Sequence, residues 1–277
     1  MKYRSVWSVL PWALVLLTAG CRFDWSGLLV GEDPDDRFER SMELNEGVER
    51  DIDSDVSYEF VVLGDVHAYE GEAQGLEAFY AWLSSSGLSP ALLLFSGDLS
   101  DTGDEGDLAL VKDLTGDGLI PAYFTLGNHD LLFDGYEAYC DIFGSSTYAF
   151  SCGPDLFICL DSANGTIGAE QMAWFRETLK TRRKDARYCF VFTHQNIFRY
   201  ASLNFSYNQP IEEIYMLMDL YESYDVNYVF MGHDHRFDDR TVRGVHYITL
   251  DDISDAESHI ILISVNADGI SFSRIGL

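Results

Sequence analysis

The chain has 277 residues, 47% of them hydrophobic, and a formal net charge of −28 at pH 7. This length and apolar content allow a sizeable buried core in one or two domains. The acidic balance argues against duplex nucleic acid as a partner, because such binding depends on Lys and Arg contacts to phosphates. It leaves a phosphorylated substrate open, since bound metal ions would reverse the sign of the charge locally.

Residues 1–20 have the pattern of a signal peptide. Lys2 and Arg4 precede an apolar stretch over about 6–19, which is shorter than the roughly 20 residues that span a bilayer. Residues 17–21, Leu-Thr-Ala-Gly-Cys, look like a bacterial lipobox, in which Cys21 becomes the lipid-modified first residue. We therefore expect an exported lipoprotein, periplasmic or at the cell surface, held at a membrane through Cys21. An ordinary signal peptide with an incidental cysteine is the alternative.

Residues 21–57 are predicted to form an acidic tether. Between residues 32 and 59 acidic side chains outnumber the arginines Arg37, Arg40 and Arg50, and apolar residues are sparse. Such a segment can bury little surface, so we expect it to be mobile or loosely attached, with a short strand near 41–44 as the alternative. Self-repulsion would extend the tether and hold the rest of the chain off the membrane.

Residues 58–277 are expected to form one α/β domain. Continuous apolar runs predict buried strands, and apolar residues at helical spacing, such as Met172, Phe175 and Leu179, predict helices that face a core. The predicted strands are 59–64, 91–96, 120–126, 147–151, 155–160, 188–193, 227–231, 245–250, 258–264 and 270–274. The predicted helices are 72–85, 107–114, 136–142, 169–181 and 211–221. Strand–helix alternation followed by consecutive strands suggests two packed sheets with helices outside.

Five of the apolar runs end in acidic, histidine or asparagine motifs, which contain five of the seven histidines. In chain order the motif residues are Asp65 and His67, Asp98, Asn128 with His129 and Asp130, His194, and His233 with His235. Functional groups in α/β sheets collect beyond the carboxyl ends of the strands, so we expect these side chains to converge. Their mixture of nitrogen and oxygen donors suits a pair of divalent transition metals.

The ordered series Asp-x-His, Gly-Asp-x-x-Asp, Gly-Asn-His-Asp, His and Gly-His-x-His, over about 58–265, resembles the calcineurin-like metallophosphoesterase family. The resemblance implies an α/β sandwich of two mixed β-sheets flanked by helices. It also implies two divalent ions, Mn, Fe or Zn. One would be bound by Asp65, His67, Asp98 and His235, and the other by Asp98, Asn128, His194 and His233.

The same resemblance implies a reaction. Asp98 would bridge the two metals, and a metal-bridging hydroxide would attack phosphorus. His129 would protonate the leaving group, and Asp130 would orient His129. Asp101 is expected to support its loop rather than bind metal, and Asp161 to act behind the ligands or structurally.

The remaining histidines and cysteines receive structural interpretations. His246 and His259 lie outside the motifs and are expected to be satisfied core residues. Cys159 and Cys189 lie in apolar runs and are predicted to be buried. Cys140 and Cys152 could form a disulfide in an oxidising compartment, although sequence alone cannot determine the pairing.

The sequence supports three functions. The first is a metal-dependent phosphoesterase for diesters or monoesters of small molecules or lipids. The others are a nucleotide-type pyrophosphatase and a non-catalytic metal-binding module, against which the leaving-group acid His129 argues. Thr102 replaces the arginine of protein phosphatases, and Gln195 and Asn196 follow His194 where many relatives have His and Pro. Residues 198–208 could hold a substrate or form a packed surface loop.

Overall fold

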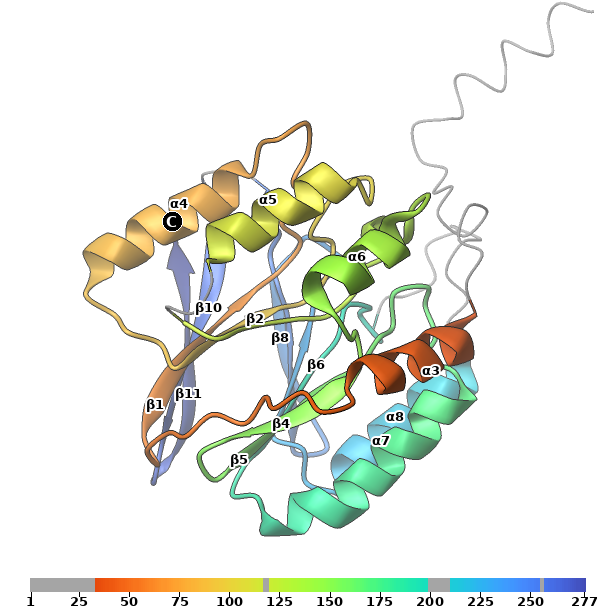
Figure 1. Cartoon of the computed structure of the whole chain (residues 1–277). Coiled ribbons are helices and arrows are strands. Elements are labelled where there is room, and N and C mark those ends of the chain that lie inside the picture. Colours follow the sequence, from red (N-terminus) through yellow and green to blue (C-terminus); the bar gives the residue numbers. More distant parts are fainter. Residues whose placement is uncertain (1–32, 117–119, 199–209, 255–256) are drawn as a thin grey trace, which may run out of the picture.

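The computed structural model describes residues 33–116, 120–198, 210–254 and 257–277 (Figure 1). The predicted signal peptide, Cys21 and residues 199–208 of the segment after His194 lie outside these ranges. Among the described residues, none of the helices has the length and apolar character needed to cross a membrane.

Two mixed β-sheets form the centre of the fold. The first has the order β11 (Gly269–Gly276), β10 (His259–Asn266), β1 (Tyr58–Leu63), β2 (Leu92–Phe95), β3 (Ala122–Phe124). The second has the order β4 (Tyr148–Cys152), β5 (Asp155–Cys159), β6 (Cys189–Phe192), β7 (Tyr228–Met231), β9 (Val245–Thr249), β8 (Asp238–Val242). Strands β1, β2 and β3 are parallel, as are β5, β6, β7 and β9. Within each sheet their carboxyl ends therefore lie at one edge. We call the side where these ends lie the catalytic edge, because the resemblance places the predicted catalytic motifs there.

Helices cover the outer faces of both sheets (Figure 1). The first sheet is covered by α4 (Gln74–Ser86), α5 (Glu105–Thr115) and α6 (Gly135–Phe143). The second carries α7 (Ala169–Arg182) and α8 (Ile211–Ser223), with α3 (Pro34–Leu44) beside α7. The predicted class, two packed mixed sheets flanked by helices, is confirmed.

Three apolar layers explain why the strands have continuous apolar runs. Val61 faces the helices of the first sheet, whereas Phe60 faces the second sheet. Between the sheets, the Phe60 ring meets Phe157 and Phe190 edge-on, with centroids 5.3 and 5.1 Å apart. A strand buried on both faces has no polar side to alternate with, so the runs predicted the strands correctly.

Strand β8 and helix α3 were not predicted. Strand β8 reads Asp-Asp-Arg-Thr-Val and lies at the edge of its sheet, where only one neighbour, β9, pairs with it. Edge strands need not be apolar, because one side of the ladder and much of the surface face water. Apolar periodicity therefore carries no signal for β8.

The predicted tether is wrong for residues 34–44. Residues 34–44 form α3, which begins with Asp33 as N-cap and a proline at its first position. Phe38 packs against Trp174 of α7, with ring centroids 6.2 Å apart. The alternative strand near 41–44 is also absent from the structure. Helix α3 has few apolar residues, so a small number of specific contacts hold it against the second sheet and its helices.

The main attachment of α3 is a buried ion pair. Arg37 donates from Nε and Nη2 to the two carboxylate oxygens of Asp161, at 2.9 and 3.0 Å. Both side chains are buried, with exposed fractions of 0% and 4%. Ser146 Oγ donates to the same carboxylate. Asp161 therefore has the structural role that was one of its two predicted roles.

Arg37→Ala should lower the free energy of unfolding by about 3–5 kcal/mol, because the Asp161 carboxylate stays buried without its cation. Urea denaturation followed by circular dichroism measures the loss. Arg40→Ala, in the same helix, is the control, since the Arg40 ion pair with Glu43 is exposed and should matter little. Equal losses in the two variants would assign the effect to the helix rather than to the ion pair.

The described cysteines are free and buried. The disulfide considered between Cys140 and Cys152 does not form. Cys140 lies on α6 in the layer outside the first sheet, whereas Cys152 lies on β4 in the layer between the sheets. The sheet between these layers separates the two thiols. Cys159 and Cys189 are buried as predicted.

Candidate metal centre

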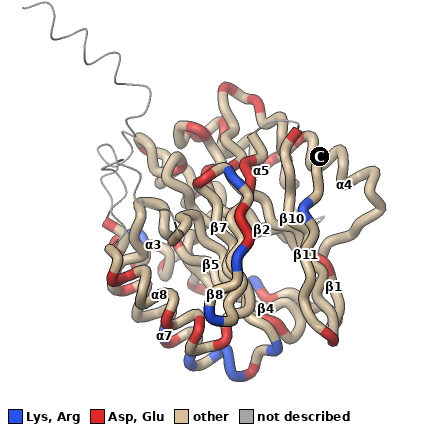
Figure 2. The backbone as a smooth tube through the Cα atoms, turned by 180° about the vertical axis from the view of Figure 1, so that it is seen from behind, with Lys and Arg blue, Asp and Glu red and all other residues tan. Residues whose placement is uncertain are grey.

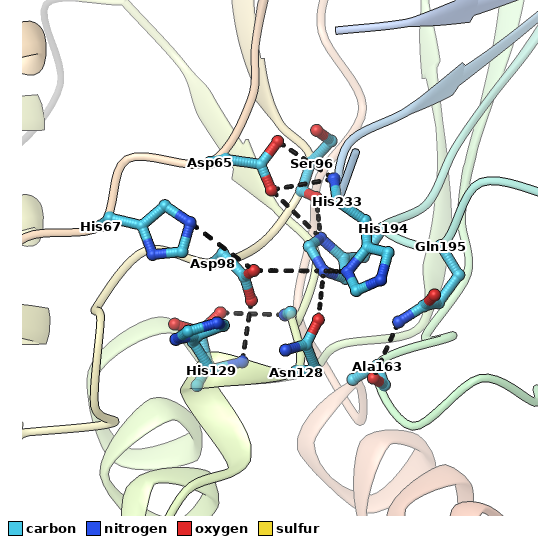
Figure 3. Close-up of polar contacts among 12 residues, drawn as sticks. Asp65, His67, Ser96, Asp98, Asn128, His129, Ala163, His194, Gln195 and His233 are labelled. Atoms are coloured by element: carbon cyan, nitrogen blue, oxygen red, sulfur yellow. Dashed lines mark hydrogen bonds and ion pairs between the residues drawn. The ribbon is translucent and has the colours of Figure 1, made fainter. Parts of the chain in front are cut away.

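The predicted ligands converge at the catalytic edge, each from the loop after its own strand (Figure 3). Asp65 and His67 follow β1, Asp98 follows β2, and Asn128 follows β3. From the second sheet, His194 follows β6, and His233 and His235 follow β7. The cluster thus lies between the two sheets, where their carboxyl ends meet.

The backbone at these ligands is unusual. Five ligand candidates have positive φ angles between 44° and 72°: Asp65, His67, Asp98, His233 and His235. Residues with a Cβ rarely adopt this region, and strain of this kind collects at functional sites. The turns direct the side chains inward rather than along the strand. Residue patterns alone did not reveal this feature.

Glycines in the motifs allow the loops to approach one another. A Cβ on Gly127 would lie 2.0 Å from Asp98 N and 2.2 Å from Asp98 Oδ1. A Cβ on Gly232 would lie 2.8 Å from Asp65 Oδ2. Any side chain at either position would push two ligand loops apart, which explains the Gly before Asn128 and His233.

Two sets of donor atoms share Asp98. The first set is Asp65, His67, Asp98 and His235, and the second is Asp98, His194 and His233, each with its donor atoms within 4.8 Å of one another. Asn128 joins the second set, because its Oδ1 lies 2.9 Å from His194 Nε2. The structure brings together all seven predicted ligands, in the grouping that the sequence predicted. Carboxylate, amide and imidazole donors of this kind suit divalent transition metals.

The hydrogen bonds of His194 direct its Nε2 towards the other members of the second set. His194 Nδ1 donates to the Ser96 carbonyl at 2.8 Å, so the neutral ring presents a lone pair at Nε2. That lone pair faces Asn128 Oδ1 at 2.9 Å and Asp98 Oδ2 at 3.3 Å. Acceptors at these distances repel one another unless a proton on Nε2 or a bound cation lies between them.

In the first set, too, a hydrogen bond at one ring nitrogen of a histidine directs the other nitrogen into the cluster. His67 Nδ1 donates to Asp101 Oδ1 at 3.1 Å, which directs Nε2 towards His235 Nε2, 3.0 Å away. In metal sites the second ring nitrogen of a ligating histidine is commonly held by a carboxylate or carbonyl in this way. Asp101 therefore holds the ligand candidate His67 from another loop, whereas the sequence predicted only that Asp101 supports its own loop.

The electrostatics of the cluster favour positive charge. Burial lowers the pKa of His194, but the carboxylates of Asp98 and Asp65 outweigh burial and raise it to about 9. For His67, burial is likewise outweighed by the bond to Asp101 and by Asp98, and the pKa rises to about 9. Burial alone would raise the pKa of Asp98, but His194 holds that pKa well below its usual range. Metal ions would compete with protons for these histidines.

The predicted partner of His129 is wrong. The His129 ring donates from Nδ1 to the backbone carbonyl of Asp101 at 2.6 Å, and Asp101 Oδ1 lies 3.5 Å from the same nitrogen. Asp130 is fully buried instead and accepts from Ser100 N and Gly127 N at 3.0 and 2.9 Å. Asp130 therefore orders the ligand loops, and residues of the Asp98 loop orient His129.

Burial raises the pKa of Asp130 to about 6, with a further contribution from Asp98, although the backbone donors at Ser100 and Gly127 oppose the shift. His129 is partly exposed, with 35% of its side chain accessible, and its backbone N donates to Asp98 Oδ1. His129 thus lies at the mouth of the cluster with Nδ1 already engaged, which leaves Nε2 for a ligand.

The structure also assigns roles to residues after His194. Asn196 Nδ2 donates to Asp234 Oδ2 at 2.7 Å, and Asp234 lies between the ligand candidates His233 and His235. Asn196 therefore ties the loop after β6 to the loop after β7. Phe198 packs edge-on against Tyr247, at 4.8 Å between centroids, so the described start of segment 198–208 is packed.

Asn196→Ala should weaken metal binding by about 10–100-fold, the usual effect of removing a partner behind the ligands. Competition with a fluorescent chelator measures the affinity. Asn227→Ala is a matched control, because Asn227 Oδ1 accepts from Cys189 N and ties the same two strands at their other end. A loss of metal affinity in both variants, or in neither, would contradict the role given to Asn196.

The histidines outside the motifs stay outside the cluster. His246 lies on β9, stacks on Tyr228 with centroids 4.6 Å apart, and bonds to Asp239. His259 begins β10 and is half-buried. His246 is therefore satisfied, as predicted, but both histidines are half-buried rather than in the core.

Comparisons with known proteins agree with this geometry. The family model described as Calcineurin-like phosphoesterase matches residues 58–237. A protein described as a probable cyclic nucleotide phosphodiesterase, from Fibrobacter succinogenes, is 25% identical over 164 residues, which are 54% of this chain. The chain spans 62% of that relative's length.

Two solved structures share the fold. A dimetal phosphatase from Danio rerio aligns with a TM-score of 0.63 at 13% identity, over 80% of this chain and 97% of its own. GAP50, described as the anchor in the inner membrane complex of Plasmodium, aligns with a TM-score of 0.62 at 16% identity, over 80% and 85%. At these identities the likeness concerns the fold alone.

Proposed function

The chain belongs to the calcineurin-like phosphoesterase family, and on that premise we propose that it is a metal-dependent hydrolase of phosphodiester or phosphomonoester bonds. The observation that carries the proposal is the shared carboxylate. Asp98 belongs to both donor sets, and each set also holds histidines whose second nitrogen or backbone is tied to the fold. A site for one structural ion would need neither the second set nor His129.

We assign Asp65, His67, Asp98 and His235 to one divalent ion and Asp98, Asn128, His194 and His233 to another. Mn, Fe and Zn all suit these donors. When bound, two such ions supply a nucleophilic water at neutral pH and stabilise charge on the phosphoryl oxygens.

We assign to His129 the proton for the leaving group. Its Nδ1–H is held by the Asp101 carbonyl, so Nε2 is the nitrogen that can face a departing alkoxide. Asp101 Oδ1, 3.5 Å from Nδ1, adds a second contact that keeps the ring in this orientation. Proton transfer from Nε2 to the leaving oxygen follows from this orientation.

Hydrolysis of bis(nitrophenyl) phosphate compared with nitrophenyl phosphate, with added Mn²⁺, tests the proposal. We expect metal-dependent hydrolysis that is faster for the diester, which is the bond type named for the Fibrobacter relative. Loss of hydrolysis on chelation and recovery with Mn²⁺ should accompany it. Hydrolysis of neither ester by metal-loaded protein would support a non-catalytic role. Cleavage of a dinucleoside pyrophosphate alone would support the pyrophosphatase.

We further propose that the protein is exported and anchored to a membrane through a lipid on Cys21. The support is the basic start, the short apolar run and Leu-Thr-Ala-Gly-Cys at residues 17–21. The substrate would then be a phosphorylated small molecule or a lipid headgroup outside the cytoplasm.

Cys21→Ala should release the protein from the membrane fraction or leave it unprocessed, because lipid attachment needs the thiol. Membrane fractionation and mass measurement of the N-terminus check this result. Membrane association that survives the substitution, with no lipid at residue 21 of the parent protein, would reject the anchor.

A further inference from the structure

The start of α8 exposes large apolar side chains. Ile211, Tyr215 and Met216 are 56%, 63% and 43% exposed. They occupy the first two turns, and we call them the α8 patch. Ile211 and Tyr215 are four positions apart and share one face. Met216 lies about 100° farther around the helix, and the exposed acids Glu212 and Asp219 lie between it and Tyr215. The opposite face of α8 is buried in the core through Leu217 and Leu220. Three large apolar side chains exposed within two turns are a candidate contact surface for another molecule or a membrane.

The patch lies where the N-terminal part of the chain reaches the fold. Glu213, in the first turn of α8, accepts from Thr166 Oγ1 and Ile167 N at 2.6 and 3.0 Å. Helix α3 is held to the same connection, because Arg37 donates to Asn164 Oδ1 at 3.1 Å. Figure 1 shows α3 and α8 starting at the same side of the molecule.

That side is the catalytic edge. The connection that holds α3 and α8 also contacts the loop of a ligand, since Gln195 Nε2 donates to the Ala163 carbonyl directly after His194 (Figure 3). The α8 patch, the start of α3 and the His/Asp cluster are thus joined through residues 161–168.

Chain length limits how far this edge can lie from an anchor. Residues 22–32 separate Cys21 from Asp33, the N-cap of α3. Even fully extended, this spacer reaches only about 40 Å, roughly the size of the domain. A weak apolar contact suffices under such tethering, because the effective concentration of the surface is on the order of millimolar.

We propose that the α8 patch rests on the lipid bilayer that holds Cys21, so that the catalytic edge faces phosphoesters displayed at the membrane surface. The proposal depends on the anchor described under Proposed function, and it narrows the substrate to membrane-borne phosphoesters such as lipid headgroups. Tyr215 suits this position, because its ring can enter the interface while its hydroxyl stays in water.

Charge decides which kind of bilayer fits. The chain carries −28, and Figure 2 shows lysines and arginines gathered where α7 ends, away from the start of α8. These include Arg182, Arg183 and Lys184. A strongly anionic bilayer would attract that basic end instead, so the α8 patch fits a zwitterionic surface.

Fluorescence quenching in full-length protein on phosphatidylcholine vesicles tests the docking. Tyr215→Cys carries an environment-sensitive fluorophore, and Ser223→Cys, about 12 Å farther along α8, is the matched control. The described cysteines are at most 5% exposed, so the introduced thiol is the reactive one among them. Nitroxide-labelled phosphatidylcholine should quench most of the fluorescence at 215 and little at 223.

Other outcomes overturn the proposal. Equal quenching at both positions, or stronger quenching at 223, would show a different orientation, the latter with the basic end on the bilayer. Shielding of 215 from both lipid nitroxide and aqueous iodide would show that residues 22–32 cover the patch. Protein that does not stay on the vesicles would reject the anchor and the docking together.

A functional measurement separates docking from the phosphoesterase proposal. Ile211→Ser with Tyr215→Ser should leave hydrolysis of soluble bis(nitrophenyl) phosphate unchanged. Hydrolysis of phosphatidylcholine headgroups in vesicles should fall by about 10-fold or more, as expected when tethered contact is lost. Equal activity on vesicles would reject the substrate part of the proposal. A failed metal centre would abolish hydrolysis in all variants but leave the quenching pattern intact.

Discussion

Asp98→Asn should remove metal from both donor sets and lower phosphoesterase activity by at least about 10³-fold. Asp98 Oδ2 lies 3.8 Å from His67 Nε2 and 3.3 Å from His194 Nε2, so one carboxylate serves both sets. Asparagine keeps the size of the side chain but removes the charge that two cations share. Loss of a partner behind one ligand costs about 10–100-fold, and loss of a shared ligand should cost more. Elemental analysis of folded protein and hydrolysis of bis(nitrophenyl) phosphate measure the two effects.

Asp155→Asn is the matched control for Asp98→Asn. Asp155 is equally buried and pairs with Arg187 at 2.6 Å, but it lies at the start of β5, at the other end of the sheet from the cluster. This control should lose stability and keep its metal. Two metals retained by Asp98→Asn would show that the carboxylate is not shared, and metal loss in both variants would assign the effect to general unfolding.

His129→Ala should keep both metals and lose about 10²–10⁴-fold in rate, the usual contribution of a positioned general acid. The loss should be largest for esters of poorly acidic alcohols, which need a proton to leave, and smaller for nitrophenol, whose anion leaves unaided. The structure supports this dependence on the leaving group, because His129 bonds through Nδ1 to the Asp101 carbonyl and lies at the mouth of the cluster. Comparison of methyl nitrophenyl and dialkyl phosphates measures this dependence.

Asp101→Asn refines the test of His129. The acceptor for His129 Nδ1 is the backbone carbonyl of residue 101, which the substitution keeps, whereas the carboxylate contacts to His67 and His129 change. We expect a smaller rate loss than in His129→Ala, with the same dependence on the leaving group. Metal loss in His129→Ala would make His129 a ligand. An equal rate loss on all esters would make it a phosphate-binding residue.

The sequence by itself determined the buried strands and the motif residues that form the cluster. Runs such as 60–63 and 189–192 are apolar because both faces of each strand are buried, and this signal is local. The motif residues end those runs, and parallel strands bring their carboxyl ends to one edge. Convergence of Asp65, Asp98 and His194 therefore follows from the order of strands and motifs.

Only the tertiary structure decided which residues support the ligands. Asp130 follows His129 directly, yet its carboxylate accepts a hydrogen bond from Ser100 N, 30 positions earlier. His129 instead donates to the backbone carbonyl of Asp101. Arg37 reaches Asp161 across 124 positions and turns an expected tether into α3. Asn196 likewise donates to Asp234, which lies 38 positions later in the chain. Whether a strand is buried can be read from its own run of apolar residues. The partner of a polar group instead depends on which distant segment folds against it.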